Sequence, residues 1–125
     1  MVNFNQQTKS IRSFIGAKNY NESREFYRSL GWQESVIDEG MSYFIVSEGI
    51  GFYLQKYYVK KWVDNTMMFL EVEDLEGMHR YVKDLNLVDQ YEYVRLSEIV
   101  HKDWGSEFFL HDPSGVLWHI GRFND

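Results

Sequence analysis

The chain has 125 residues, of which 44% are hydrophobic and 26% are charged, so it fits one globular domain and wholesale disorder is excluded. Its formal net charge of −6 repels phosphate backbones and anionic lipid surfaces, so neither nucleic acid nor a membrane is an expected partner. The absence of cysteine excludes a disulfide framework, a thiolate nucleophile and thiolate-bound zinc or iron–sulfur clusters.

In chain order, the first clear elements are two amphipathic helices, each with apolar residues at helical spacing. Each helix has a polar cap residue before it and a stop residue after it. The first helix is predicted over 20–30, with Asn19 as its cap and Gly31 as its stop. The second is predicted over 75–85, with Asp74 as its cap and Asn86 as its stop. A strand-like run precedes each helix, at 11–17 and at 66–72. All these features recur at an offset of 55 residues, which predicts an internal repeat.

Three short strand candidates separated by turn residues follow each helix. They cover 32–37, 41–47 and 51–57 in the first half, and 93–100, 107–111 and 116–122 in the second. An insertion near 88–93 ends the constant offset in the second half. Each half therefore predicts the order strand–helix–strand–strand–strand.

Three motifs add to this repeat. They are an acid and a serine followed by Phe26-Tyr27 in the first helix, Leu-Glu-Val-Glu-Asp-Leu at 70–75, and a final hairpin at 108–120 whose turn reads Asp-Pro-Ser-Gly. Proline presets a turn dihedral angle and glycine accepts positive φ, so the hairpin sequence has a physical basis. Together the motifs resemble the vicinal oxygen chelate superfamily, which includes glyoxalase I, bleomycin-resistance proteins, fosfomycin-resistance enzymes and extradiol dioxygenases. The resemblance covers roughly residues 8 to 123.

The resemblance implies an α+β fold in a single domain, 1–125. Two βαβββ modules, about 8–59 and 64–123, would form an open barrel-like sheet with the helices on its outer side. Alternation along each strand then decides which side chains face the helices and which line the cavity. Ile11, with Ser13 and Ile15, is expected to face the first helix. The predicted ligand-binding residues are Arg12, Phe14, Tyr53, Gln55, Tyr57, Met67, Phe69, Leu117 and His119.

Metal enzymes of the superfamily place one ligand on each of four strands, and the resemblance puts Arg12, Gln55, Met67 and His119 at those positions. Only Gln55 and His119 are suitable donors, because a guanidinium repels cations and a thioether suits soft metals. Two neutral donors without a carboxylate do not hold a divalent ion in water. We therefore expect neither a metal nor another cofactor.

Other polar residues have simpler structural interpretations. His111 is interpreted as an exposed hairpin residue, His79 as a solvated residue opposite the apolar stripe of its helix, and the pair 60–61 (Lys-Lys) as a solvated turn between the modules. Glu71 shares the inward face of its strand with Phe69 and stays a candidate for the site.

Apolar walls with a few polar groups are typical of small-molecule sites. We therefore expect a metal-free small-molecule-binding protein similar to bleomycin-resistance proteins. Arg12 would pair with a carboxylate or phosphate, and the aromatic side chains would stack on a planar part of the ligand. Because members of the superfamily commonly pair so that modules of two chains complete the cavities, a homodimer is expected.

Two alternatives stay open, and no catalytic residue is assigned. In the first, the aromatic residues assigned to the cavity fill a closed core instead. In the second, the chain is a glyoxalase-like lyase or a dioxygenase that uses a non-standard metal site or acid–base chemistry by His119 and Glu71. A cytoplasmic location is expected, because no apolar run reaches the roughly 20 residues of a membrane span and none resembles a signal peptide.

Overall fold

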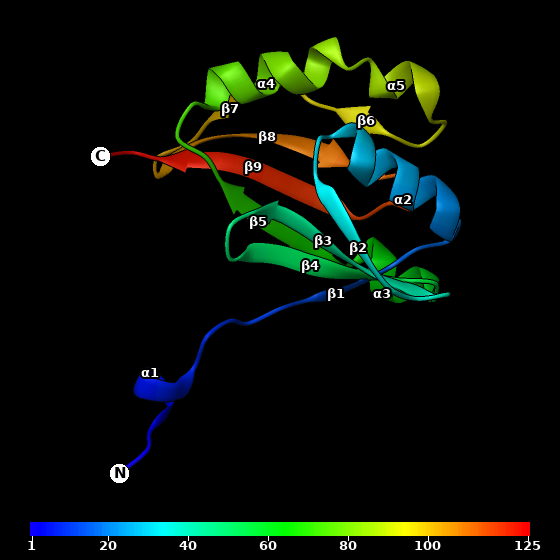
Figure 1. Cartoon of the computed structure of the whole chain (residues 1–125). Coiled ribbons are helices and arrows are strands. Elements are labelled where there is room, and N and C mark those ends of the chain that lie inside the picture. Colours follow the sequence, from blue (N-terminus) through cyan, green and yellow to red (C-terminus); the bar gives the residue numbers. More distant parts are fainter.

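The computed structural model describes residues 1–125, and its strands form two sheets, one from each half of the chain (Figure 1). The strands are β1 Phe14–Gly16, β2 Gln33–Asp38, β3 Met41–Ser47, β4 Ile50–Gln55, β5 Met67–Glu71, β6 Arg95–Leu96, β7 Val100–His101, β8 Gly105–His111 and β9 Leu117–Phe123. The helices are α1 Phe4–Gln7, α2 Tyr20–Ser29, α3 Lys60–Asp64, α4 Leu75–Asp84 and α5 Leu87–Gln90. The first sheet has the order β1-β4-β3-β2, and the second has the order β5-β9-β8-β6 with β7 also paired to β8. None of the helices is long and apolar enough to cross a membrane.

The long helices α2 and α4 begin at the predicted residues and end one residue before the predicted ends, at Ser29 and Asp84. The side chains of Asn19 and Asp74 each accept a hydrogen bond from the backbone N–H three residues later, at 3.1 and 2.9 Å. Such caps satisfy donors that the first helical turn leaves free. Gly31 and Asn86, the two predicted stops, have φ of 94° and 60°, and Asn86 is the only non-glycine residue with positive φ. The repeated cap–helix–stop pattern is therefore a real feature of the backbone.

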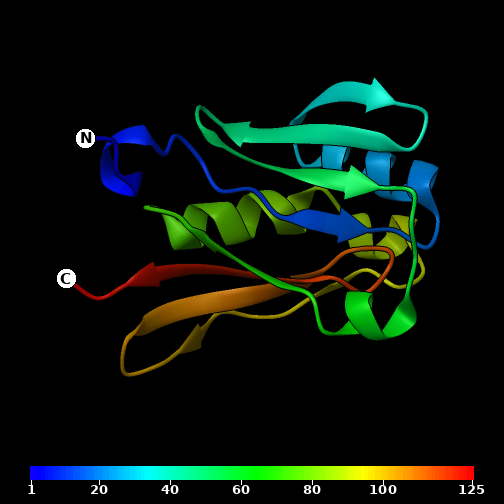
Figure 2. The same cartoon turned by 90° about the horizontal axis from the view of Figure 1, so that it is seen from below.

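The two halves have corresponding strand pairings. β1 pairs in parallel with β4, and β5 pairs in parallel with β9. Seen from below, β1 and β5 run beside each other between the two sheets (Figure 2), and the Ser13 hydroxyl donates to the Met68 sulfur at 3.5 Å. These residues are 55 positions apart, so equivalent positions of the repeat meet there. The predicted α+β class, with two sheets and helices outside, is confirmed.

The hydrophobic core is continuous across the two halves. Trp118 of β9 lies 5.2 Å from the Phe52 ring and 5.0 Å from the Trp32 ring, between ring centroids, and both of these partners come from the first half. Phe52 in turn packs against Tyr27 of α2 and Phe44 of β3. Several aromatic residues therefore fill the core, but Phe14, Tyr57 and Phe69, which were assigned to the cavity, are exposed, so the first alternative is wrong for them.

A buried hydrogen-bond network joins the final hairpin to α2. The Asp112 carboxylate, which is fully buried, accepts from the Tyr27 hydroxyl at 2.6 Å and from three successive backbone N–H groups at 2.8–2.9 Å. Trp118 Nε1–H donates to the Tyr27 oxygen at 3.0 Å. Burial raises the pKa of Asp112 despite these bonds. The Asp-Pro-Ser-Gly motif therefore closes the hairpin and also anchors it to the other half.

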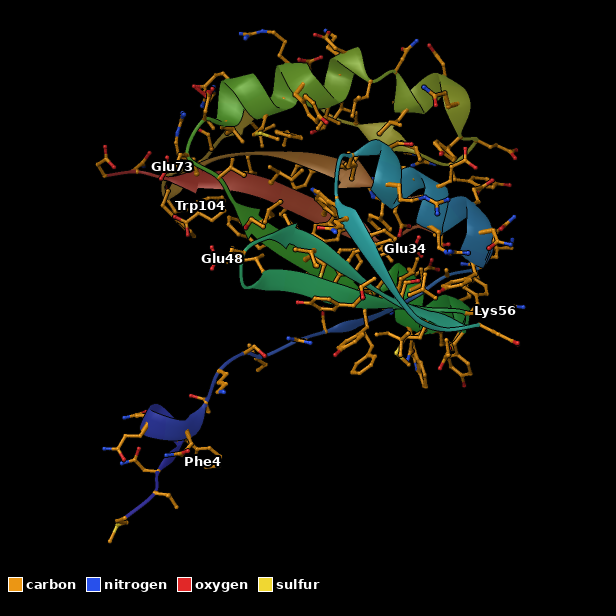
Figure 3. The ribbon with its side chains drawn as sticks, viewed as in Figure 1. Phe4, Glu34, Glu48, Lys56, Glu73 and Trp104 are labelled. Atoms are coloured by element: carbon orange, nitrogen blue, oxygen red, sulfur yellow. The ribbon has the colours of Figure 1, made fainter.

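The chain departs from the prediction at its beginning. The first strand covers only β1, and Ile11 is fully exposed instead of facing α2. Residues 1–11 leave the body as an arm that carries α1 (Figure 1), and Phe4 on this arm lies clear of the sheets (Figure 3). The alternating pattern of the strand continues into the arm, but no neighbouring strand is present there to pair with it.

Three further expectations were wrong. The segment 93–100 forms β6 and β7, and not one strand, because the Ser97 hydroxyl between them accepts the Phe109 N–H of β8 at 2.8 Å. His79 is buried, and its Nε2 lies 2.8 Å from the Ser97 carbonyl oxygen. The pair 60–61 begins helix α3, which buries Val63 against the body.

Candidate ligand-binding site

Strand pairing places the predicted ligand-binding residues on the open side of the sheets, away from α2 and α4 (Figures 1 and 2). In the first sheet Phe14 is opposite Tyr53, and in the second Phe69 is opposite His119. Their neighbours along the strands point to the core, where residues such as Ile15 are buried. The alternation predicted from the sequence therefore holds, although Arg12 precedes β1 and Tyr57 follows β4.

The open side of the first sheet holds a cationic–aromatic cluster of Arg12, Phe14, Tyr43 and Tyr53. Arg12 Nη1 donates to the Tyr53 hydroxyl at 2.8 Å, and its guanidinium carbon lies 4.4 Å from the centre of the Tyr43 ring. Phe14 stacks on Tyr53 with 4.8 Å between ring centroids. The hydrogen bond that Arg12 donates to Tyr53 raises the pKa of Arg12, and no acidic side chain forms an ion pair with it. The cluster therefore presents an unneutralised cation on an aromatic base.

The open side of the second sheet holds a histidine cluster of His119, Glu107, Phe69 and Phe109. His119 Nδ1 lies 2.8 Å from Glu107 Oε1, and the carboxylate is almost completely buried. Phe109 packs edge-on against the imidazole at 5.0 Å, and Phe69 lies parallel to it at 6.3 Å. Because Nδ1 faces a carboxylate, it carries the proton, and Nε2 is left as an acceptor without a partner in the chain. The carboxylate that bonds His119 is thus Glu107 and not Glu71.

Sequence reasoning missed Tyr43, Glu107 and Phe109 as members of these clusters. Tyr43 and Phe109 alternate with buried neighbours on β3 and β8, so the period of two that selected Phe14 and Phe69 also applies to them, whereas Glu107 lies in a stretch of β8 that is buried throughout. The signal was present, but only strands that carry supposed metal positions were read for inward-facing side chains.

A single chain does not enclose the predicted residues in one cavity. A cavity of about 140 Å³ beside α3 is lined by Phe14, Gln55 and Tyr57 together with Trp62. The remaining apolar residues face solvent, and Met67 and Phe69 are 62% and 45% exposed. Contiguous exposed apolar surface of this kind marks an interaction site. The chain thus presents the residues on one face without closing over them.

The residues at the four metal positions do not fit a divalent ion. Arg12 is bound to Tyr53 and stacked on Tyr43, and it brings a positive charge to the position. Met67 offers only a thioether. No group of three or more histidine, cysteine, aspartate or glutamate side chains converges as metal ligands would.

Solved structures match nearly the whole chain, whereas no family model and no curated protein matches the sequence. A bleomycin-binding protein complexed with bleomycin is 17% identical over 94% of this chain and 100% of that chain, with a TM-score of 0.78. A transposon-encoded bleomycin resistance determinant has the same identity and coverage and a TM-score of 0.79. A glyoxalase/bleomycin resistance protein from Catenulispora acidiphila, also 17% identical over 94% and 100% of the two chains, has a TM-score of 0.73. The chain therefore has the fold of the vicinal oxygen chelate superfamily, and the predicted resemblance is confirmed at the level of the fold.

Proposed function

We propose that the chain binds a small organic anion with a planar part on the open side of its sheets, and that it does so without a metal. The observation that carries this proposal is the cationic–aromatic cluster. Arg12 uses one donor to reach Tyr53 and keeps the others for a ligand, and a guanidinium suits the two oxygens of a carboxylate or phosphate. Because Tyr43 and Tyr53 already hold Arg12 in place, little side-chain freedom is lost on binding.

The same proposal includes a second copy of the chain as the cover of the open side. Its support is the apolar surface that one chain leaves exposed, both on the sheets and on the arm 1–11, where Phe4 and Ile11 are 86% and 100% exposed. Side chains of this size are rarely left in water over such a contiguous area. The structural neighbours support small-molecule binding, since one of them is a bleomycin-binding protein solved with bleomycin.

The dimer is tested by light scattering during size-exclusion chromatography. The wild type is expected at twice the chain mass of 15.0 kDa, and Ile11→Asp is expected to shift it toward a single chain, because it places a charge on the proposed contact. Val88→Asp is the matched control, since Val88 is 49% exposed but lies on α5, on the helical side. A strict monomer for the wild type would exclude the proposed cover.

The ligand class is tested with 2-naphthoate and its neutral analogue 2-naphthamide by isothermal titration calorimetry. We expect 2-naphthoate to bind, and Arg12→Ala to weaken it roughly tenfold or more while the amide is unaffected, because only the carboxylate uses the charge. Arg80→Ala, an exposed arginine on α4, removes the same charge from the helical side. Equal losses for the two variants would contradict a site at Arg12.

The histidine cluster supports a second candidate function, an enzyme of the same fold that works by acid–base chemistry. Glu107 orients the ring of His119 and leaves Nε2 able to accept a proton, which is the arrangement of a general base. A lyase-type proton transfer fits this arrangement, and it needs no metal. If the chain converts a bound ligand, and this conversion persists in Arg80→Ala but is lost in His119→Asn, the result would favour the enzyme over the binding protein.

A further inference from the structure

A second cavity of about 380 Å³ lies where the two halves of the chain meet, and none of the predicted ligand-binding residues lines it. We call it the seam cavity. Its walls come from the segment before α2, from α3 and the segment before it, and from β6, β8 and the final hairpin turn. Its volume is that of a site for a small metabolite and far exceeds that of a single water.

The seam cavity is positively charged although the whole chain is acidic. Lys18, Lys60 and Arg95 line it, and Asp64 is the only acid among the lining residues. Asp64 is already paired with Lys60 at 2.6 Å, so Lys18 and Arg95 remain without an acidic partner. Two unpaired cations from different halves of the chain therefore face one cavity.

His111 also lines the seam cavity. It was expected to be an exposed hairpin residue, but it is half-buried on β8, directly opposite Arg95 of β6. Burial lowers the pKa of His111, and the positive charge of Arg95 lowers it further. His111 is therefore a polar ring beside an unpaired arginine, and it faces the same cavity as Lys18.

The geometry of the seam cavity is held by direct contacts between the halves. The Lys18 backbone N–H donates to the Ser114 hydroxyl oxygen at 2.9 Å, and Ser114 also lies 3.3 Å from the Ser23 hydroxyl. These contacts fix the segment of Lys18 against the turn that follows β8. Tyr58 and Tyr93 stand in the wall with hydroxyl groups that have no partner in the chain, so neutral donors are available beside the cations.

We propose that the seam cavity binds the phosphate group of a small phosphorylated molecule, with Lys18 and Arg95 as its charged contacts and His111 as a third donor. Arginine and lysine both suit phosphate oxygens, and a dianion neutralises the two free cations. Arg12 and its aromatic partners do not line the seam cavity, so the two sites can be tested separately, although His111 shares one face of the second sheet with Leu117 of the open side. Binding there joins the halves and therefore stabilises the fold as a whole.

The test titrates the full chain with inorganic phosphate, using chloride at equal ionic strength as the reference. Phosphate is expected to raise the melting temperature above the chloride reference and to shift the ring signals of His111 in nuclear magnetic resonance spectra. It is also expected to raise the pKa of His111, with Lys18, Lys60, Asp64 and Arg95 as the charged groups around the ring. An unchanged His111 signal at saturating phosphate would overturn the proposal even if a variant failed to fold.

The matched variants carry the same change of charge. Lys18→Ala with Arg95→Ala is expected to lower phosphate affinity at least tenfold, whereas Arg80→Ala with Lys83→Ala, two exposed residues of α4, should leave it within twofold. Equal losses in the two double variants would show a response to net charge only and would overturn the site. Arg12→Ala is expected to keep phosphate affinity, so failure of the open-side proposal and failure of the seam cavity are distinguishable.

Discussion

Asp112→Ala is expected to lower the free energy of unfolding by about 3–5 kcal/mol, because it leaves several buried hydrogen-bond donors without an acceptor. The Tyr27 hydroxyl and three backbone N–H groups of the hairpin turn would all lose their acceptor in a site that water does not reach. Urea unfolding followed by circular dichroism measures this change.

Two further variants are compared with Asp112→Ala. Asp112→Asn keeps an oxygen for the backbone N–H groups but meets the Tyr27 hydroxyl with a weaker acceptor or a competing donor, so we expect a loss of about 1–3 kcal/mol. Asp84→Ala removes an exposed carboxylate at the end of α4 and is expected to change stability by no more than about 0.5 kcal/mol. A loss for Asp112→Ala no larger than that of Asp84→Ala would contradict the role of the buried network.

The network also has a pH signature. Because burial raises the pKa of Asp112, the folded chain holds this proton to higher pH than the unfolded chain does. Its contribution to stability is therefore fully present below the ordinary aspartate pKa and is lost as pH rises through the raised value. Glu34 acts in the opposite direction: burial opposes its ionisation, but hydrogen bonds from Arg24 and Ser42 lower its pKa, so its contribution is lost as pH falls. The difference between wild type and Asp112→Asn isolates the Asp112 contribution.

Trp118→Ala is expected to lower the free energy of unfolding by about 3–5 kcal/mol, since it opens a large cavity in the core. Trp118 is 2% exposed, contacts Trp32 and Phe52, and donates to Tyr27. All three partners belong to the first half, so hydrogen exchange should speed up by similar factors in both sheets. Trp62→Ala, at a site 64% exposed on α3, is the matched control and is expected to cost less than about 1 kcal/mol.

Exchange that accelerates in the second sheet alone would show that the halves unfold separately. The aromatic core would then be two cores that only touch, and the contact between Trp118 and Phe52 would contribute little to cooperativity.

The fold was predictable because its signals are local and occur twice. A cap such as Asn19, a stop such as Gly31 and a period of two along a strand each act within a few residues, and the second copy at 55 positions confirmed them. The same locality explains the success with Phe14 and Phe69, which follow directly from strand alternation.

The interactions that build the candidate sites were not predictable in the same way. The contact between Glu107 and His119 depends on the register of β8 against β9, and no short-range pattern specifies which carboxylate meets the ring. His111 was interpreted as exposed, but tertiary packing half-buries it at the seam cavity, whereas Lys60 lines the same cavity and stays exposed as expected. The prediction that Ile11 faces α2 was wrong for the opposite reason, because a strand pattern does not form a strand where no neighbouring strand is present.

The internal repeat has a consequence for how a ligand would be oriented. Arg12 and Met67 occupy equivalent positions of the two halves, as do Phe14 and Phe69. Both halves therefore have a phenylalanine at the second of these positions, but only the first half has a positive charge at the first. A groove formed between the first sheet of one copy and the second sheet of another would have a guanidinium on one wall and an imidazole–carboxylate pair on the other. A molecule in that groove would have a defined head and tail, and a two-fold dimer would hold two such molecules running in opposite directions, one for each chain.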